Sequence, residues 1–144
     1  MRHLGLLALV VPDYDEAIAY YTGALGFELR ENTPQPDDAP LSGNAGGKRW
    51  VVVAPGPEAQ TGLLLARAVT DHQRSRIGDQ TGGRVGFFLY TDDFDADLAR
   101  FTAAGVTIEK PPWTAPYGRV AVFVDRYGNR WDLLQPSAAP SVEK

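Results

Sequence analysis

The stretch LGLLALVVPDYDEAIAYYTGALGF, residues 4–27, decides the fold, because RVGFFLYTDDFDADLARFTAAGV, residues 84–106, repeats its design. Each stretch reads as an apolar strand, a turn of acid, aromatic ring and acid, an amphipathic helix, a glycine and a further strand. Asp13 aligns with Asp93, and Ile18 aligns with Leu98, at a common offset of 80 residues. This internal repeat predicts two modules with the same secondary structure.

The shared elements of the two helices have physical reasons. Asp13 is predicted to cap the first helix through its carboxylate, and either Asp92 or Asp93 the second. Each helix is expected to stop before a glycine, Gly26 or Gly105, because a left-handed residue is needed there. The apolar stripes at helical spacing are formed by Tyr14, Ala17, Ile18, Tyr21 and Leu25 in the first helix and by Phe94, Leu98 and Phe101 in the second.

The rest of each module also corresponds. GKRWVVVA (residues 47–54) resembles YGRVAVFV (residues 117–124), and each is followed by a turn and another strand, GLLLAR or NRWDLL. Each module is then βαβββ, which predicts an α+β protein whose two modules form one cupped mixed sheet with helices on its outer face. The expected boundaries are module one at 1–67, a polar linker at 68–82, module two at 83–136 and a flexible tail at 137–144.

Composition excludes several classes of function. The formal net charge is −4 and no dense Lys/Arg cluster is present, so nucleic acid is not an expected partner. The chain has no cysteine, which excludes disulfides and thiolate metal sites and suits a reducing cytoplasm. No apolar run approaches the ~20 residues of a membrane helix, so no membrane partner is expected.

The pattern resembles the vicinal oxygen chelate superfamily, which includes glyoxalases, bleomycin resistance proteins and extradiol dioxygenases. The resemblance covers residues 3–136 and rests on the two repeated stretches and on YGRVAVFVDRYGNRWDLLQP. That last segment resembles the family's hairpin with an Asp-Pro-Asp-Gly-Asn turn. Arg126-Tyr127 replace Pro-Asp here, but Asp125 can still accept backbone hydrogen bonds and Gly128-Asn129 tolerate positive φ.

The resemblance also implies where a metal would bind. In metal-dependent members four inward-facing side chains hold the ion, and their positions fall here at Leu6, at Leu64 or Leu65, near Gly86 and at Asp132. Of these residues Asp132 alone carries a side chain that coordinates metals, and one carboxylate cannot retain a transition metal. The expectation is therefore a protein without a metal or other cofactor.

Asp132 is the candidate catalytic residue. It lies in the apolar strand Trp131-Asp132-Leu133-Leu134, where a carboxylate must face a polar cavity or be paired, because a bare buried charge is costly. Facing the cup it would have a perturbed pKa and could act as a general base or bind a cationic substrate. The alternative is an ion pair with Arg130 or Arg119.

The candidate substrate-binding residues are aromatic or basic. Residues 109–120, EKPPWTAPYGRV, are expected to form a stiff loop with two exposed rings, and period-2 alternation places Trp131 under a helix. Arg49 and Arg119 occupy equivalent places and either bind an anionic group or are solvated strand ends. His3 is expected at the surface or in a dimer contact, with a metal role as the alternative, and His72 in a solvated linker that can also fold over the mouth of the cup. The substrate-binding candidates are Trp50, Phe88, Trp113, Tyr117, Arg119 and Arg130.

Three functions remain open from the sequence. The first is a small-molecule binding protein, or a metal-free enzyme using Asp132, with its ligand in an apolar aromatic cup. The second is a metal-dependent lyase or dioxygenase of glyoxalase type. The third is a non-catalytic subunit whose cup is filled by its own side chains, such as Leu6 and Leu65. A homodimer is expected, because a single cupped sheet exposes its edge strands.

Overall fold

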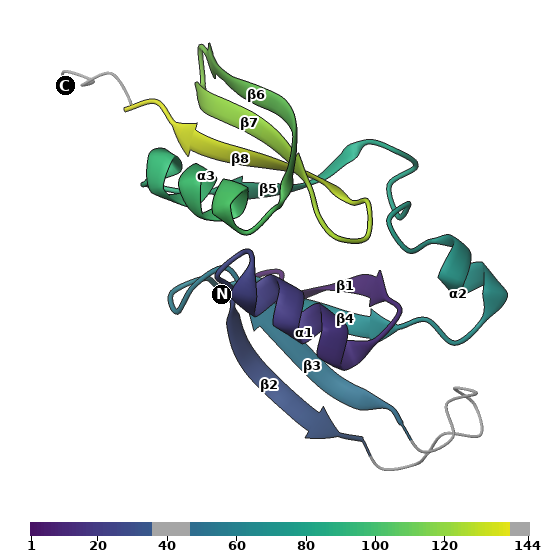
Figure 1. Cartoon of the computed structure of the whole chain (residues 1–144). Coiled ribbons are helices and arrows are strands. Elements are labelled where there is room, and N and C mark those ends of the chain that lie inside the picture. Colours follow the sequence, from purple (N-terminus) through teal and green to yellow (C-terminus); the bar gives the residue numbers. More distant parts are fainter. Residues whose placement is uncertain (36–46, 139–144) are drawn as a thin grey trace. The chain divides into compact units, whose positions relative to one another are not determined.

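The computed structural model describes residues 1–35 and 47–138, and it divides into two compact units at Gln80 and Thr81 (Figure 1). The tail expected at residues 137–144 lies outside the described residues from position 139 onward. No helix in the described part is long and apolar enough to cross a membrane.

Each unit contains one complete βαβββ module. The first unit consists of β1 (Leu6–Val11), α1 (Tyr14–Gly23), β2 (Glu28–Pro34), β3 (Arg49–Ala54), β4 (Gly62–Arg67) and α2 (Asp71–Ser75). The second consists of β5 (Val85–Tyr90), α3 (Phe94–Ala103), β6 (Thr107–Ala115), β7 (Gly118–Val124) and β8 (Arg130–Pro136).

The two modules share one topology. Each builds a four-stranded mixed sheet, in the order β1-β4-β3-β2 in the first unit and β5-β8-β7-β6 in the second. The first strand of each module pairs in parallel with the last, and the other neighbours are antiparallel. The predicted α+β class and the two βαβββ modules are confirmed.

The predicted helix ends are confirmed as well. The carboxylate of Asp13 accepts a hydrogen bond from the Glu16 backbone N–H at 2.8 Å, and Asp93, rather than Asp92, caps α3. Gly26 and Gly105 follow the helices with φ angles of 72° and 81°, in the region that favours glycine.

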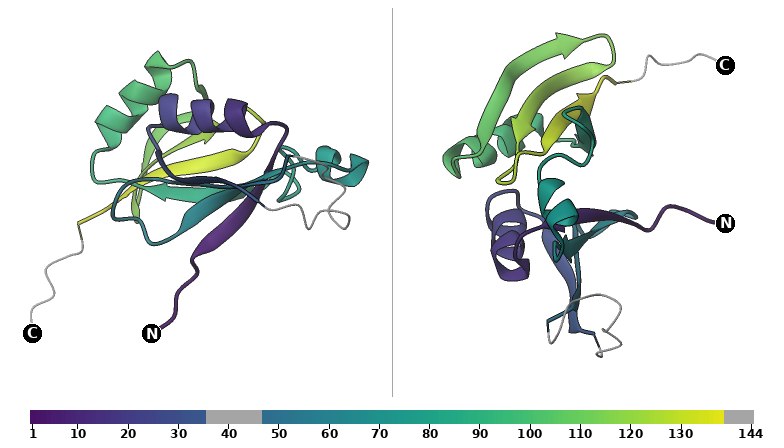
Figure 2. Two further views of the ribbon diagram at one scale, coloured as in Figure 1. Left: turned by 90° about the horizontal axis from the view of Figure 1, so that it is seen from below. Right: turned by 90° about the vertical axis from the view of Figure 1, so that its right-hand side faces the viewer.

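The core of each module lies between its helix and one face of its sheet (Figure 2). In the first module Ala17 and Tyr21 of α1 are fully buried, as are Leu9 and Val11 of β1. In the second, the ring of Phe123 is tilted against Phe101 and stacked on Trp131, with centroids 4.8 and 5.6 Å apart. The prediction that Trp131 packs under a helix is therefore confirmed.

Two segments differ from their sequence interpretation. The polar linker 68–82 contains the short helix α2, which Thr70 caps by accepting from the Gln73 backbone N–H at 3.0 Å. The proline-rich stretch expected as a loop is mostly strand β6. Prolines fit there because β6 is an edge strand with a bulge between Lys110 and Trp113, where ladder hydrogen bonds are not required.

Candidate functional site

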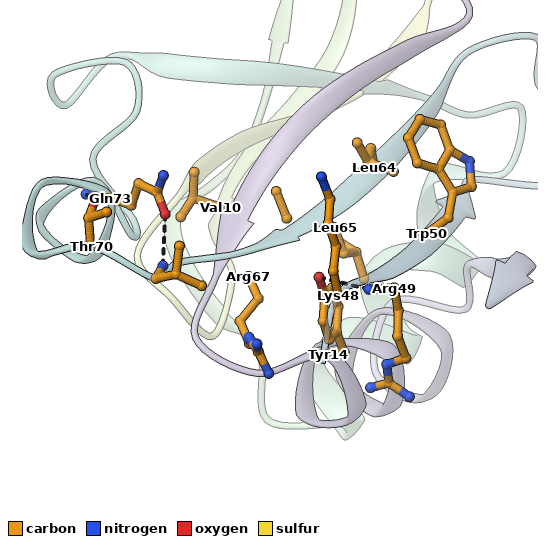
Figure 3. Close-up of a pocket in the computed structure, with 12 residues that line it drawn as sticks. Val10, Tyr14, Lys48, Arg49, Trp50, Leu64, Leu65, Arg67, Thr70 and Gln73 are labelled. Atoms are coloured by element: carbon orange, nitrogen blue, oxygen red, sulfur yellow. Dashed lines mark hydrogen bonds between the residues drawn. The ribbon is translucent and has the colours of Figure 1, made fainter. Parts of the chain in front are cut away.

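The first unit contains a pocket of about 450 Å³ at the end of its sheet where β3 begins and β4 ends (Figure 3). We call it the strand-gap pocket. Its basic and aromatic lining residues are Tyr14, Lys48, Arg49, Trp50 and Arg67. Its apolar and polar walls come from β1, β4 and the start of α2 through Val10, Leu64, Leu65, Val69, Thr70 and Gln73.

The pocket exists because β3 and β4 separate. Along these two strands the residue pairing is confined to Val52 with Leu64 and Val53 with Leu63. The corresponding strands of the second module, β7 and β8, pair without interruption from Gly118–Pro136 to Val124–Arg130. The first hairpin is therefore open at the end where the second is closed.

Tyr14 occupies the opening between the strands. Its hydroxyl accepts a hydrogen bond from the backbone N–H of Arg49 at 3.2 Å, and its side chain is buried. In the second module the equivalent residue is Phe94, which has no hydroxyl, and Arg119 pairs directly with Gln135 of β8. The Tyr14 hydroxyl thus takes the place of a strand partner for this N–H.

Two guanidinium groups flank the Tyr14 ring. Cζ of Arg49 lies 4.7 Å and Cζ of Arg67 5.4 Å from the ring centroid, and Figure 3 shows them on opposite sides of the ring. Both distances are within the range of cation–π attraction. Arg67 also lies against the backbone of Gly47, where an added Cβ would stand 2.9 Å from Nη2. Glycine at this position therefore leaves the space that the guanidinium occupies.

Arg49 is held by a contact that the repeat preserves. Its Nη2 lies 2.9 Å from a carboxylate oxygen of Asp15. In the second module Arg119 makes the same ion pair with Asp95, and its Cζ lies 4.7 Å over the ring of Phe94. Because both modules contain this arrangement, it belongs to the architecture of the repeat. Arg119 thus makes within its own module the contacts that Arg49 makes in the first.

The pocket has a clear charge. Lys48, Arg49 and Arg67 contribute three cationic groups, and among residues 1–35 and 47–138 no Asp or Glu lines it. Trp50, half-buried on β3, adds an aromatic surface, and Leu64 of β4 adds an apolar one. At the start of α2 the Gln73 side-chain oxygen accepts from the Val69 backbone N–H at 2.7 Å, which fixes that wall. The arrangement suits an apolar or aromatic molecule with a negative charge.

Asp132, the candidate catalytic residue, lies in the second unit. It pairs with Phe88 of β5 and Val122 of β7, and it alternates with the buried Trp131 and Leu133, so it is on the sheet face away from α3. Burial raises the pKa of its carboxyl, and the charge of Lys110 opposes this shift.

The alternative ion pair of Asp132 is wrong. Arg130 instead binds Glu109, with Nε 2.8 and 3.1 Å from its two carboxylate oxygens, and donates to the Gly83 carbonyl at 2.8 Å. The hydrogen bond from Arg130 lowers the pKa of Glu109. Arg119 is paired with Asp95. Among the described residues, Asp132 thus has no basic partner in hydrogen-bond contact.

The remaining candidate residues are distributed over both units, Trp50 in the first and the others in the second. Arg130 lines a second pocket of about 400 Å³ with Glu109 and Lys110. Phe88, Trp113 and Tyr117 are exposed, as expected for the two rings of the proline-rich stretch, but line neither pocket. Of the predicted substrate-binding residues, Trp50 lines the strand-gap pocket.

The two candidate metal positions on β4 differ in exposure. Leu64 and Leu65 both line the strand-gap pocket, but Leu64 is half-buried and Leu65 is fully buried. His3 and His72 are exposed. Among residues 1–35 and 47–138, no three His, Asp or Glu side chains come close enough to hold a metal ion. The residues present therefore do not fit the four-ligand metal site of the related metalloenzymes.

Sequence reasoning missed Tyr14, Lys48 and Arg67 as site residues. A signal for two of them was present, because Lys48 directly precedes β3 and Arg67 ends β4. In an antiparallel hairpin the start of one strand and the end of the next lie at the same end of the sheet. Basic residues at both places therefore predict a shared cationic end. Nothing in the sequence alone indicated that the strands separate there.

Comparison with known proteins places these features in a family. The family model described as Glyoxalase/Bleomycin resistance protein/Dioxygenase superfamily matches residues 3–133. An uncharacterized protein of Shewanella frigidimarina is 50% identical over 129 residues, which cover 90% of each chain.

Two solved structures are similar over nearly the whole chain. TnmS3, described as an antibiotic binding protein from Streptomyces sp. CB03234, is 33% identical with a TM-score of 0.71, covering 95% of this chain and 98% of its own. UcmS2 is 28% identical with a TM-score of 0.74, covering 93% and 98%.

Proposed function

Since this chain belongs to the Glyoxalase/Bleomycin resistance protein/Dioxygenase superfamily, we propose that it reversibly binds a small organic molecule with a planar ring in the strand-gap pocket. The observation that carries this proposal is the separation of β3 from β4, which opens a pocket of about 450 Å³ beside Trp50, Leu64 and Tyr14. A volume of this size is typical of small-molecule sites, and a stacked ring contributes large contact area.

A relative supports binding rather than turnover as the first hypothesis. TnmS3, which is 33% identical, is described as an antibiotic binding protein. The polar groups that the described residues place at the strand-gap pocket are cationic side chains, an amide and hydroxyls, with no carboxylate among them to act as a base. Such a set can orient a ligand by charge and hydrogen bonds.

A ligand screen with a matched pair of variants tests the proposal. Planar aromatic compounds of increasing ring number, including naphthoate and naphthamide, are screened by thermal shift. A ligand present at 100-fold over its Kd adds about 2.7 kcal/mol of stability. Trp50→Leu is expected to abolish the shift, whereas Trp113→Leu, in the other unit, preserves it. If no compound shifts the melting temperature, or if Trp50→Leu leaves the shifts intact, the proposal fails.

The proposal includes the absence of a tightly bound transition metal. The implied metal positions hold Leu6, Leu64 and Gly86 beside Asp132, and a single carboxylate does not retain such an ion against water. Elemental analysis of the purified protein is expected to show no stoichiometric zinc, nickel, manganese or iron. One tightly held metal per chain would instead favour the glyoxalase-type lyase or dioxygenase.

Metal-free acid–base chemistry at Asp132 is the second candidate. Its supporting observation is a carboxyl whose pKa burial raises, on the sheet face away from α3. A raised pKa brings a carboxyl closer to the range in which it can exchange a proton with a substrate. This candidate requires a substrate that Asp132→Asn still binds but no longer converts. Equal turnover by the variant and the wild type would exclude it.

We also propose that the protein is a homodimer. The apolar rings of Phe88 and Tyr90 are 59% and 65% exposed on β5, an edge strand of the second sheet. Exposed apolar edges favour association in oligomers. Sedimentation at micromolar concentration is expected to give twice the 15.7 kDa chain mass. A species of one chain mass would contradict it.

A further inference from the structure

We propose that the ligand of the strand-gap pocket is an aromatic carboxylate, whose negative charge is bound by Lys48 and Arg67 while its ring lies on Trp50. This inference rests on the proposed function and adds the chemical class of the ligand. It is carried by the comparison of the two modules, because the second module shows what the fold itself requires at the same positions.

The residues shared by both modules account for the fold. The ion pair of Arg49 with Asp15 has its equivalent in Arg119 with Asp95, and a ring lies under each arginine. These contacts are therefore structural. Arg49 is also neutralised by its acid, so it adds little net charge to the pocket.

The residues that differ between the modules are those that make the pocket cationic. Lys48 aligns with Gly118, just as Arg49 aligns with Arg119. Arg67 aligns with Gln135, because Leu64 and Asp132 pair with the equivalent residues Val52 and Val122. The repeat therefore folds without a cation at either place, and both charges are additions to the first module.

In the second module the residue equivalent to Arg67 is Gln135, which makes a hydrogen bond that Arg67 cannot make. Gln135 Oε1 accepts a hydrogen bond from the Phe94 backbone N–H at 2.9 Å, at the start of α3. Arg67 has no acceptor in its side chain, so it cannot make this bond at the start of α1. Its guanidinium lies instead between Gly47 and the Tyr14 ring and lines the pocket. Contact with both surfaces restricts its orientation before any ligand arrives, which lowers the entropic cost of binding.

The charges match a carboxylate. Within the part of the chain that the structure describes, Lys48 has no ion pair and no Asp or Glu lines the pocket. The chain as a whole has a net charge of −4, so the cationic pocket is a local departure from the overall charge. A guanidinium binds a carboxylate through two parallel N–H groups, and an ammonium adds a point charge. Trp50 and Leu64 provide the apolar surface for the ring.

Naphthoate and naphthamide separate this inference from the proposed function, because they have the same ring and nearly the same shape but different charge. Binding is measured by calorimetry. The wild type is expected to bind naphthoate at least about tenfold more tightly than naphthamide, since charge-assisted hydrogen bonds exceed neutral ones. Raising the salt concentration should weaken naphthoate binding and leave naphthamide binding unchanged.

Variants of Arg67 and Lys48 test which side chains cause the preference for the charged probe. Arg67→Gln introduces the residue of the second module and is expected to reduce the naphthoate preference to about threefold or less. Lys48→Met should reduce it partially. Arg74→Gln, a loss of the same charge on the exposed face of α2 in the same unit, serves as the control and should retain the full preference. Circular dichroism verifies the fold of each variant.

Gly47→Ala tests position without changing charge. The new Cβ would stand within about 3.0 Å of both terminal nitrogens of Arg67, so the guanidinium must move. Naphthoate affinity is expected to fall several-fold while naphthamide affinity stays constant. A merely electrostatic effect of Arg67 at a distance would leave both affinities unchanged.

Three outcomes of these measurements would contradict the assignment in part or in full. Equal binding of the two probes by the wild type overturns the carboxylate assignment and leaves the proposed function standing. If the wild type binds neither probe, both the carboxylate assignment and the proposed function are overturned for ligands with this ring. A naphthoate preference that persists fully in Arg67→Gln and in Lys48→Met places the anion elsewhere and overturns the assignment to these residues.

Discussion

The β3–β4 hairpin and the β7–β8 hairpin occupy the same place in the two modules, yet the first is open and the second is closed. Pairing in the first is confined to two positions, whereas the second pairs over all seven residues of β7. The strand order, the helix and the Asp–Arg ion pair are the same in both. A few side chains therefore determine whether this hairpin forms a continuous ladder or a pocket.

Hydrogen bonds to a buried carboxylate stabilise the turn of the closed hairpin. Asp125 is buried and accepts hydrogen bonds from the backbone N–H groups of Tyr127 and Asn129, from the Asn129 amide and from the Trp131 indole. The connection at the same place in the first module, residues 55–61, is PGPEAQT. There the guanidinium of Arg30 contacts the carbonyl of Gly56 at 2.8 Å from outside the hairpin.

Gly118→Lys is expected to have the largest effect, because it puts the residue of the open hairpin into the closed one. Gly118 has a φ angle of 152°, and a Cβ there would collide with the Gln135 carbonyl oxygen and approach the Pro136 Cα to 2.9 Å. Strain and overpacking together should cost about 2 to 5 kcal/mol of unfolding free energy. Urea denaturation measures this loss of unfolding free energy. A variant as stable as the wild type would show that the closed hairpin does not depend on glycine.

Asp125→Ala should destabilise the protein nearly as much. It leaves the Trp131 indole and the Asn129 amide without their buried acceptor, which costs about 3 kcal/mol. The near-ultraviolet circular dichroism of the tryptophans should change at the same time. Asp79→Ala, an exposed acid at the end of the first unit, is the matched control and should change stability by less than about 0.5 kcal/mol. Similar losses of unfolding free energy in both variants would contradict a specific role of Asp125 in the turn.

Tyr14→Phe gives the first module the ring of the second. It removes the hydroxyl that accepts from the Arg49 N–H, and the open strands have no nearby replacement at this position. The expected loss is about 1 kcal/mol of unfolding free energy. Tyr90→Phe, at an exposed tyrosine of β5, should be neutral. Equal effects would mean that the Tyr14 hydroxyl does not support the open hairpin.

Asp132→Asn should have the smallest effect, and that effect depends on pH. Burial raises the pKa of Asp132 in the folded state above the ordinary value of 3.8, so folding favours its protonated form. Its contribution to stability is therefore full below about pH 3.8 and is lost as the pH rises through the raised pKa. The asparagine variant should gain stability relative to the wild type across that window. Urea titrations at several pH values measure the difference, and a pH-independent difference would contradict the shift.

The fold was largely predictable because its signals are local and occur twice. Asp13 and Asp93 cap helices whose apolar stripes have helical period, and Gly26 and Gly105 follow them with positive φ. Helix α2 was not predictable in the same way. It has five residues and none of them is buried, so it leaves no periodic apolar pattern.

The candidate site was less predictable. Asp132 was placed correctly on the sheet face away from α3, because alternation along a strand fixes its face. The residues that line the strand-gap pocket were not found together. Trp50 was identified by its ring, whereas Tyr14 was interpreted as part of a helix stripe. It does lie on that stripe, but its hydroxyl reaches the N–H of Arg49 across the module.

The sequence by itself determined the two modules, the main helix of each, the succession of strands along the chain and the face of Asp132 on its strand. These follow from periodicity, capping and turn chemistry, which act over a few residues. The tertiary structure alone decided that β3 and β4 separate, that Tyr14 fills the gap, and that Lys48 and Arg67 border one pocket. Such features depend on how residues distant in sequence compete for the same backbone hydrogen bonds, and that competition is settled only when the helix packs on its sheet.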